Sequence, residues 1–394
     1  MSTNDRIFYA CQGVALTNHG DTSVVAGDMV RGLQSVGMTT NFNLEQAFEL
    51  GQIEIYENIE GTPDVEVTME KVLDGHPLIY HMASSGVAGT SASGLVGRSK
   101  ARADMRLGIF SDANNSLKGA TDNSGKAEVE VYCSGMYISS ISYTIPTDGS
   151  ATESVTLVGN NKQWLTGSDV KILDAAVDDS DGLDSAEMGV AGAASGGVSQ
   201  REDVLLSGCI LPNSIKGIAG SGYGNAYNAS DGSNKVHLQS LSISTDFSRE
   251  EILELGRKTP YARPANFPIE VSCEIEAITT SGDFVNAYEF GDTSLDGTVD
   301  SGNNTQNELI FLFLKQGYGW DLGSKNRLSS VSYGGGDAGG GNVTCTYSYT
   351  NFNDLDVQSW KHNAYIGWGA LKNGITAKYA NDAGTGPFPS NILG

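Results

Sequence analysis

The chain has 394 residues, enough for two domains of ordinary size, and a formal net charge of −23. This charge excludes ordinary phosphate binding, because a protein that holds nucleic acid needs a basic surface. Fifty glycines against nine prolines, with short apolar stretches between polar turns, predict a mainly β fold in which helix is the minority state.

The chain shows no signal for export or for membrane insertion. Residues 1–6 carry two charges and lack the apolar core of a secretory signal. The best apolar run, Leu309 to Leu314, is far shorter than the roughly 20 residues that cross a bilayer. We therefore expect a soluble protein made in a reducing cytoplasm. Its five widely spaced cysteines are expected to be buried thiols, not disulfides or zinc ligands: Cys11, Cys133, Cys209, Cys273 and Cys345.

The chain contains the same sequence pattern twice. Leu33 to Gly51 aligns without gaps with Leu238 to Gly256, and nine of the nineteen positions are identical. A second block, Ile138 to Tyr143, matches Leu328 to Tyr333 in the same order. Two blocks in one order indicate a duplicated domain.

The duplication predicts a four-part organisation. The connector and the tail are set apart by their Gly-rich composition, and the connector by its many Asp, Ala and Ser residues, which is typical of loosely ordered segments. The expected parts are a first domain at 1–165 with an insert at about 84–125, a linker at 166–201, a second domain at 202–365 and a C-terminal arm at 366–394.

Within each copy the sequence predicts a short helix. Asn43 followed by Gln46, and Ser248 followed by Glu251, have the spacing of a capping box at a helix start. An apolar side and a glycine after about two turns complete each pattern. Each copy is thus predicted to be a β-sandwich or barrel-like domain with one short flanking α-helix.

The predicted strands alternate between apolar and polar residues, so one face is core and the other is wet. Residues 65–70, 128–131 and 269–276 show this alternation, whereas Leu309 to Leu314 is apolar throughout and predicts a strand covered on both faces. The polar positions carry seven glutamates: Glu66, Glu70, Glu128, Glu130, Glu270, Glu274 and Glu276.

The sequence predicts no catalytic, cofactor-binding or metal site. Residues 119–126 have the wrong glycine spacing for a phosphate loop and lack the Ser or Thr that would bind magnesium. The acidic segments 174–187 and 292–300 lack the ligand spacing of a calcium loop, and the five histidines form no ligand pair. Residues 334–341 are expected to form a lengthened hairpin tip.

Ile138 to Trp164, with the sequence ISSISYTIPTDGSATESVTLVGNNKQW, resembles the strand, hairpin and strand near the end of a phage tail-tube domain. Its counterpart is Leu328 to Trp360. The blocks Gln34 to Glu70 and Gln239 to Glu276 resemble the part of that domain where its helix packs on the sheet.

The resemblance implies a non-enzymatic virion protein of the tail, with two packed sheets per domain whose strands join neighbours in an inner barrel. Six domains usually close a ring, so this two-copy chain would form a trimer with pseudo-sixfold symmetry. The rings would stack around a channel, lined by the seven glutamates, through which DNA passes without specific binding. Sheath, baseplate hub and tail terminator proteins are the implied partners.

Three other readings stay open. A baseplate hub or tube-end protein is also trimeric with two tube-like domains. A virion adhesin would show exposed aromatic patches, and a secreted β-sandwich hydrolase would need paired carboxylates in a cleft. The polar glutamates could also simply face outside solvent.

Overall fold

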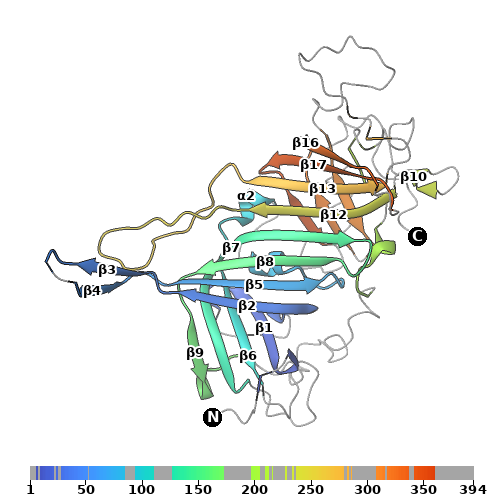
Figure 1. Ribbon diagram of the computed structural model, residues 1–394. Helices are drawn as coiled ribbons and strands as arrows, with labels where there is room; N and C mark the ends of the chain where they lie inside the picture. The colour runs from blue at the N-terminus through green and yellow to red at the C-terminus, as the bar shows by residue number, and fades with distance from the viewer. Residues whose placement is uncertain are drawn as a thin grey trace, which may run out of the picture.

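In the computed structural model the regular structure is mainly antiparallel strands with a few short helical segments, which confirms the mainly β fold (Figure 1). No helix in the described part is long and apolar enough to cross a bilayer. The structure describes residues 6–7, 9–21, 24, 28–51, 53–84, 94–110, 127–172, 197–204, 209–212, 215, 227–228, 233–234, 237–278, 282–283, 285, 308–315, 317–336 and 341–359.

Eight strands form one continuous sheet that contains strands of both sequence copies. Their order across the sheet is β16-β17-β13-β12-β7-β8-β5-β2. The first copy supplies β2 (Leu33–Asn41), β5 (Asp64–Val72), β7 (Val129–Pro146) and β8 (Thr152–Gly159). The second copy supplies β12 (His237–Asp246), β13 (Glu270–Ile278), β16 (Arg327–Gly334) and β17 (Thr344–Phe352).

The two halves of this main sheet repeat each other in strand order and in register. The order β7-β8-β5-β2 in one half corresponds to β16-β17-β13-β12 in the other. The strand pairs of the two halves also have shifts in register at equivalent positions. Leu33 of the first copy thus corresponds to Leu238 of the second, and Ile138 corresponds to Leu328. The shifts lie at Leu33/Ser35 and Ile138/Ser140 in the first half and at Leu238/Ser240 and Leu328/Ser330 in the second.

A second layer covers the apolar face of the main sheet. Strand β7 belongs to both layers: its first part pairs with β6 and β9, and its last part with β8 and β12. Gly135 lies close to the junction of these parts with φ +67°, a conformation that favours glycine. The other strands of this layer are β1 (Gln12–Asn18), β6 (Ala103–Ile109), β9 (Gln163–Thr166), β14 (Phe311–Leu314), β15 (Tyr318–Asp321) and β18 (Asp356–Ser359).

One apolar core runs through both copies. Tyr143 of the first copy and Trp320 of the second are fully buried, and their ring centroids are 5.2 Å apart. Strand β14 is buried along its whole length, which confirms the prediction of a strand covered on both faces. All five cysteines are free and buried, as expected.

The predicted helices after Asn43 and Ser248 are wrong. Both residues have positive φ. The backbone N–H of Asn43 donates a hydrogen bond to the side chain of Asn41, and that of Ser248 donates one to the side chain of Asp246. These turns send the chain away from the sheet as two arms. The first arm is a hairpin of β3 (Leu44–Phe48) and β4 (Ile55–Glu60), and in the second Ile252 pairs with Ala262 in an isolated bridge.

Short helices occur elsewhere, in the first copy. They are α1 (Ile79–Ala83) and α2 (Leu95–Arg98). Three 3₁₀ turns and one further two-stranded hairpin complete the described elements: Tyr9–Cys11, Gly167–Asp169 and Arg201–Asp203, and β10 (Tyr227–Asn228) with β11 (Ser233–Asn234).

The predicted insert and linker are partly integral to the fold. Strand β6 falls inside the expected insert and pairs with both β1 and β7. At the ends of the expected linker, Val170 and Ile172 are fully buried, and the backbone of Ser199 bonds to Leu73 and Ala151. Residues 85–93, 111–126, 173–196 and 360–394, which include most of the expected linker and the whole expected C-terminal arm, lie outside the described residues.

Two tyrosines at equivalent positions of the two copies are expected to contribute unequally to the stability of the single chain. Tyr143 is 1% exposed, whereas its counterpart Tyr333 is 54% exposed. Tyr143→Ala should lower the free energy of unfolding of the unassembled chain by about 3 to 5 kcal/mol. Tyr333→Ala, the matched control, should cost less than about 1 kcal/mol. Urea unfolding checks both, and equal losses would contradict the different packing of the two halves.

Candidate assembly surfaces

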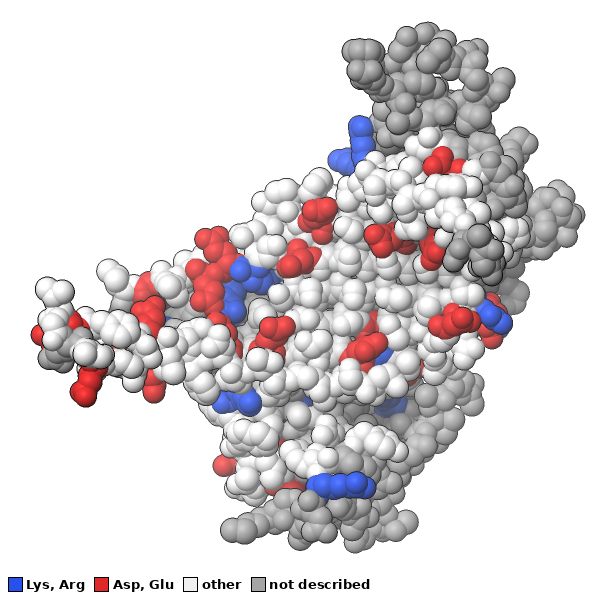
Figure 2. All heavy atoms as spheres, viewed as in Figure 1, with Lys and Arg blue, Asp and Glu red and all other residues white. Residues whose placement is uncertain are grey.

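The polar face of the main sheet carries carboxylates spread among hydroxyl side chains. The burial of β5 and β13 alternates, so their apolar residues point into the core and their glutamates point away from it. Figure 2 shows this face as a largely uncharged surface with separate carboxylates. Five of the predicted glutamates lie here: Glu66, Glu70, Glu270, Glu274 and Glu276.

The other two predicted glutamates do not belong to this face. Glu130 is fully buried in the second layer, where it forms an ion pair with Arg106 at 2.5 Å and accepts hydrogen bonds from the backbone of Lys171 and Ile172. The expectation that Glu130 faces solvent is therefore wrong. Glu128 lies just before β7, and its backbone bonds to Ile109 of β6 in the second layer.

The two halves of the sheet meet at the seam between β7 and β12. The paired residues run from Ser240 opposite Pro146 to Asp246 opposite Ser140. Beyond the ladder, Arg249 donates from Nε to the carbonyl of Ile138 at 2.8 Å.

Arg249 also holds the seam through two aromatic rings. Its guanidinium lies 5.1 Å from the ring centre of Tyr137 and 5.2 Å from that of Phe247. A guanidinium at this range is attracted to the face of an aromatic ring. Burial lowers the pKa of Arg249 to about 10, so it stays charged at neutral pH.

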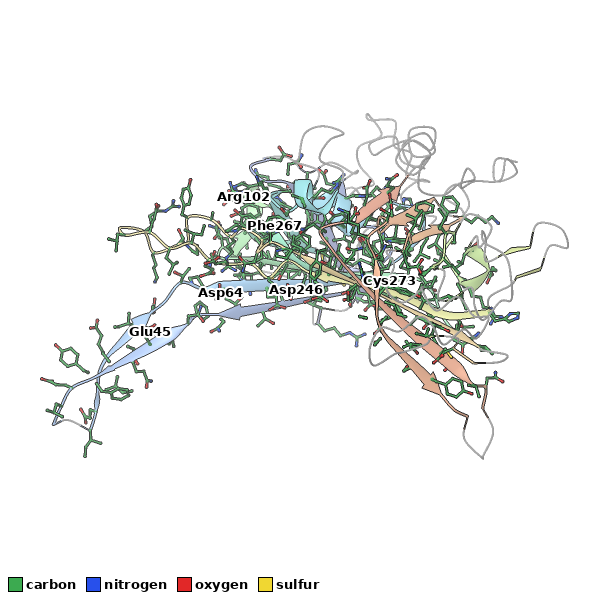
Figure 3. The ribbon with its side chains drawn as sticks, turned by 90° about the horizontal axis from the view of Figure 1, so that it is seen from above. Glu45, Asp64, Arg102, Asp246, Phe267 and Cys273 are labelled. Atoms are coloured by element: carbon green, nitrogen blue, oxygen red, sulfur yellow. The ribbon has the colours of Figure 1, made fainter. Side chains whose placement is uncertain are left out.

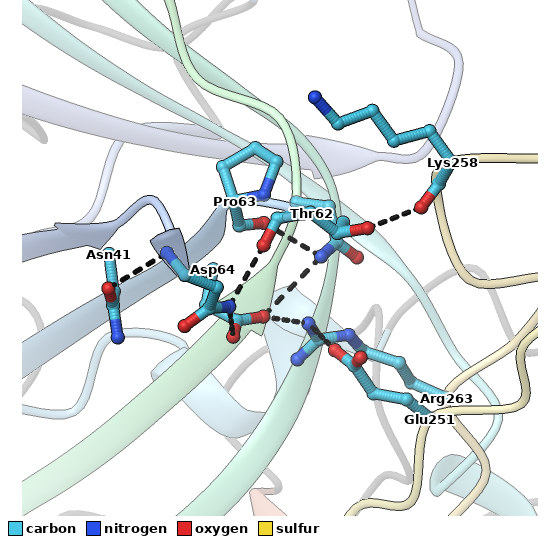
Figure 4. A network of polar contacts seen from close by, with 9 residues as sticks. Asn41, Thr62, Pro63, Asp64, Glu251, Lys258 and Arg263 are labelled. Carbon is cyan, nitrogen blue, oxygen red and sulfur yellow. Dashed lines mark hydrogen bonds and ion pairs between the residues drawn. The ribbon is translucent and has the colours of Figure 1, made fainter. Parts of the chain in front are cut away.

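A polar network ties the bases of the two arms together (Figure 4). Arg263 of the second arm forms ion pairs with Asp64 and Glu251, and the hydroxyl of Thr62 donates to the carbonyl of Lys258. Partial burial acts to raise the pKa of Asp64. Hydrogen bonds from Asn43 and Arg263, together with the Arg263 charge, outweigh it and hold that pKa below the usual value.

The arms project from one end of the sheet and expose apolar side chains (Figures 1 and 3). The tips share a Leu-Gly pair with positive φ at the glycine: Leu50 is 103% exposed and Leu255 is 104% exposed. Further exposed apolar residues on the arms are Leu44, Phe48, Ile53, Tyr56, Leu253 and Tyr261. Exposed apolar clusters of this kind mark contacts with other molecules.

The outermost strands of the main sheet, β2 and β16, are open in the described structure. Among described strands, β2 pairs only with β5 and β16 only with β17. Each therefore presents one row of backbone N–H and C=O groups without a neighbouring strand, a ready template for another chain.

Several potentially reactive side chains of the described part are buried. No cluster of three His, Cys, Asp or Glu with metal-binding geometry occurs among the described residues. Burial raises the pKa of the Cys209 and Cys273 thiols to about 12, so neither supplies a thiolate at neutral pH. His81 is fully buried, and burial lowers its pKa to about 3.

The comparisons with known proteins give partial likenesses to tube assemblies. No family model and no curated protein matches the chain. Among solved structures, the anti-feeding prophage cap, described as a tube-terminating cap, covers 42% of this chain and 95% of its own, with 14% identity and a TM-score of 0.29. The sheath-tube complex of an extracellular contractile injection system, PVC, in its extended state gives the same coverages and TM-score with 10% identity.

The sequence did not reveal the residues that hold the seam. Arg249 lies in the stretch predicted to be a helix and Arg263 follows it, and in the sequence both look like ordinary surface cations. The available signal was the pair of Asn or Asp residues two positions before Asn43 and Ser248, because Asn-x-Asn and Asp-x-Ser favour side-chain-capped turns.

The burial of Glu130 separates structural from surface glutamates. Glu130→Gln leaves the Arg106 charge buried without its counter-ion, so it should lower the free energy of unfolding by about 3 to 5 kcal/mol. Glu66→Gln, an exposed glutamate on the polar face, should change it by less than about 0.5 kcal/mol. Chemical unfolding at pH 7 measures both. A small effect of Glu130→Gln would mean that the ion pair does not support the second layer.

Proposed function

We propose that the chain is a non-enzymatic structural subunit of a virion tail tube, which closes into trimeric rings that stack around an acidic channel for DNA. The observation that carries the proposal is the main sheet itself. One half repeats the other, the halves are joined edge to edge, and the two outer edges are unlike and open.

Unlike edges favour closed rings over two-fold dimers. A contact between two different surfaces is head-to-tail, and repeating it generates a ring when the rotation closes. Because each chain already contains one such joint, three chains supply six sheet units. This is the basis for a trimer with pseudo-sixfold symmetry.

The layers of the chain support a channel on the polar face. The second layer covers the apolar face of the main sheet, so a closed ring has the second layer on one side and the polar face on the other. With the polar face inward, Glu66, Glu70, Glu270, Glu274 and Glu276 line the channel. Carboxylates repel a polyanion and reduce its adhesion to the wall, over a distance of about 8 to 10 Å at physiological salt.

The arms support stacking of the rings. They leave the sheet at one end, and their apolar tips are fully exposed in the single chain. Contact with the next ring removes this apolar surface from water, which stabilises the stack.

Electron microscopy and mass measurement test the assembly. The purified chain should form rings or tubes in negative stain, and native mass spectrometry of one disassembled ring should give three chains. A six-chain ring would overturn the trimer, and single unstacked rings would point to a hub or tube-end protein. A monomer at all concentrations would overturn the proposed function.

Lysine substitution tests the position of the polar face. Changing the five channel glutamates to lysine should let assembled tubes hold short duplex DNA in a nuclease-resistant form at low salt, with release as salt rises. The matched control changes five exposed arm glutamates instead: Glu45, Glu49, Glu54, Glu57 and Glu60.

The control variant undergoes the same change in charge, but DNA bound to it should remain open to nuclease. Protection by the arm variant alone, or by neither variant in tubes of normal shape, would contradict an inward polar face.

A further inference from the structure

The seam inside the chain provides a template for a contact between chains. At that seam β12 of the second copy lies beside β7 of the first, with Ile243 opposite Tyr143 and Ser244 opposite Ser142. The repeated registers make β2 the counterpart of β12 and β16 the counterpart of β7. The two open edges are therefore the missing halves of a second, identical seam.

Exposure at the open edges fits a contact that is unmade in the single chain. Phe247, beside the internal seam, is fully buried, whereas its counterpart Phe42 is 63% exposed. Tyr143 and Tyr333 differ in the same direction. In both cases the exposed member lies at an open edge, where the neighbouring strand is missing.

We propose that β2 of one chain pairs antiparallel with β16 of a second copy, in the register of the internal seam. The register places Met38 opposite Tyr333, Thr39 opposite Ser332 and Gly37 opposite Gly334. The inference rests on the proposed ring assembly and names the surfaces through which its chains meet. The contact buries Phe42 and Tyr333 and gives the open backbone N–H and C=O groups of both edge strands hydrogen-bonding partners.

The proposed seam differs from the internal seam in which strand carries the positively charged side chain. At the internal seam, Arg249 of the arm base contacts Tyr137 of β7 and Phe247. The counterparts are Leu44 for Arg249, Arg327 for Tyr137 and Phe42 for Phe247. The cation thus comes from β16 instead of the arm, and Arg327 of one chain meets Phe42 of the next.

This difference favours pairing of the two unlike edges over pairing of two like edges. Pairing of β2 with a second β2 would give a seam with two Phe42 rings and no Arg327. Pairing of β16 with a second β16 would bring the Arg327 residues of both chains to one seam. Only the β2 to β16 contact combines one cation with one aromatic ring, as the internal seam does.

Disulfide trapping tests the contact and its register. The variant Thr39→Cys with Ser332→Cys should form disulfides between chains on mild oxidation. Thr39→Cys with Ser330→Cys, displaced by two residues on the same face, should link at least tenfold more slowly. The native cysteines are buried and do not compete.

The internal seam supplies the positive control. Ser142→Cys with Ser244→Cys occupies the equivalent opposite positions and should form a disulfide within one chain. Faster linking by the displaced pair would overturn the register. Dimers of Thr39→Cys alone would overturn the direction.

Association strength gives a second measurement. Arg327→Ala and Phe42→Ala should each weaken ring formation about tenfold, and the double variant should be no more than about threefold weaker than either, because both remove one contact. Additive losses would overturn the pairing of these side chains. Normal rings without the 39–332 link would overturn this inference alone, whereas linked chains that never form rings would overturn the proposed function alone.

Discussion

Hydrogen bonding between β7 and β12 is the interaction on which the rest of the architecture depends. It converts two sequence copies into one sheet, so neither half has a closed boundary of its own. A sheet extended in this way keeps two open edges, and open edges are tolerated in a soluble protein only when they are covered, twisted away or paired. The seam therefore leaves β2 and β16 as the outer edges of the main sheet, where the proposed contact with a second copy would pair them.

The two copies differ in the charged groups that are buried on the core face of the main sheet. In the first copy Glu153 is buried and accepts hydrogen bonds from the backbone of Ile79 and Tyr80 at the start of α1, and Lys71 is buried beside Asp74. Burial raises the pKa of the Glu153 carboxyl, while Lys71 and the two amides act against that rise. The matching strand positions of the second copy hold Ala277 and Cys345, so this charged cluster belongs to the first copy alone.

Much of the main sheet could be predicted from the sequence because its information is local and periodic. Alternation in residues 65–70 and 269–276 reports which side of a strand is buried, and the duplicated blocks report which strands correspond. Glu130 shows the limit of this reasoning. Its alternation with Val129 and Val131 is as regular as in β5, yet Arg106 of the neighbouring strand and the backbone of Lys171 and Ile172 cover its side chain. Alternation identifies residues that share a face but not what covers that face.

The arms show where the prediction of secondary structure from local sequence patterns failed. Leu44, Phe48 and Leu50 look like the buried side of a short helix, but in the single chain they are largely exposed. Apolar residues normally lie in a core, so a prediction made from a single chain places them in the core of that chain. If these residues become buried between chains, the apolar pattern correctly predicts that they are buried in the assembly. It then fails only in predicting that they lie on a helix. Retention of the turn at Asn43 and Ser248 in both copies is consistent with that explanation, because the turn sets the direction of each arm whether or not its tip is covered.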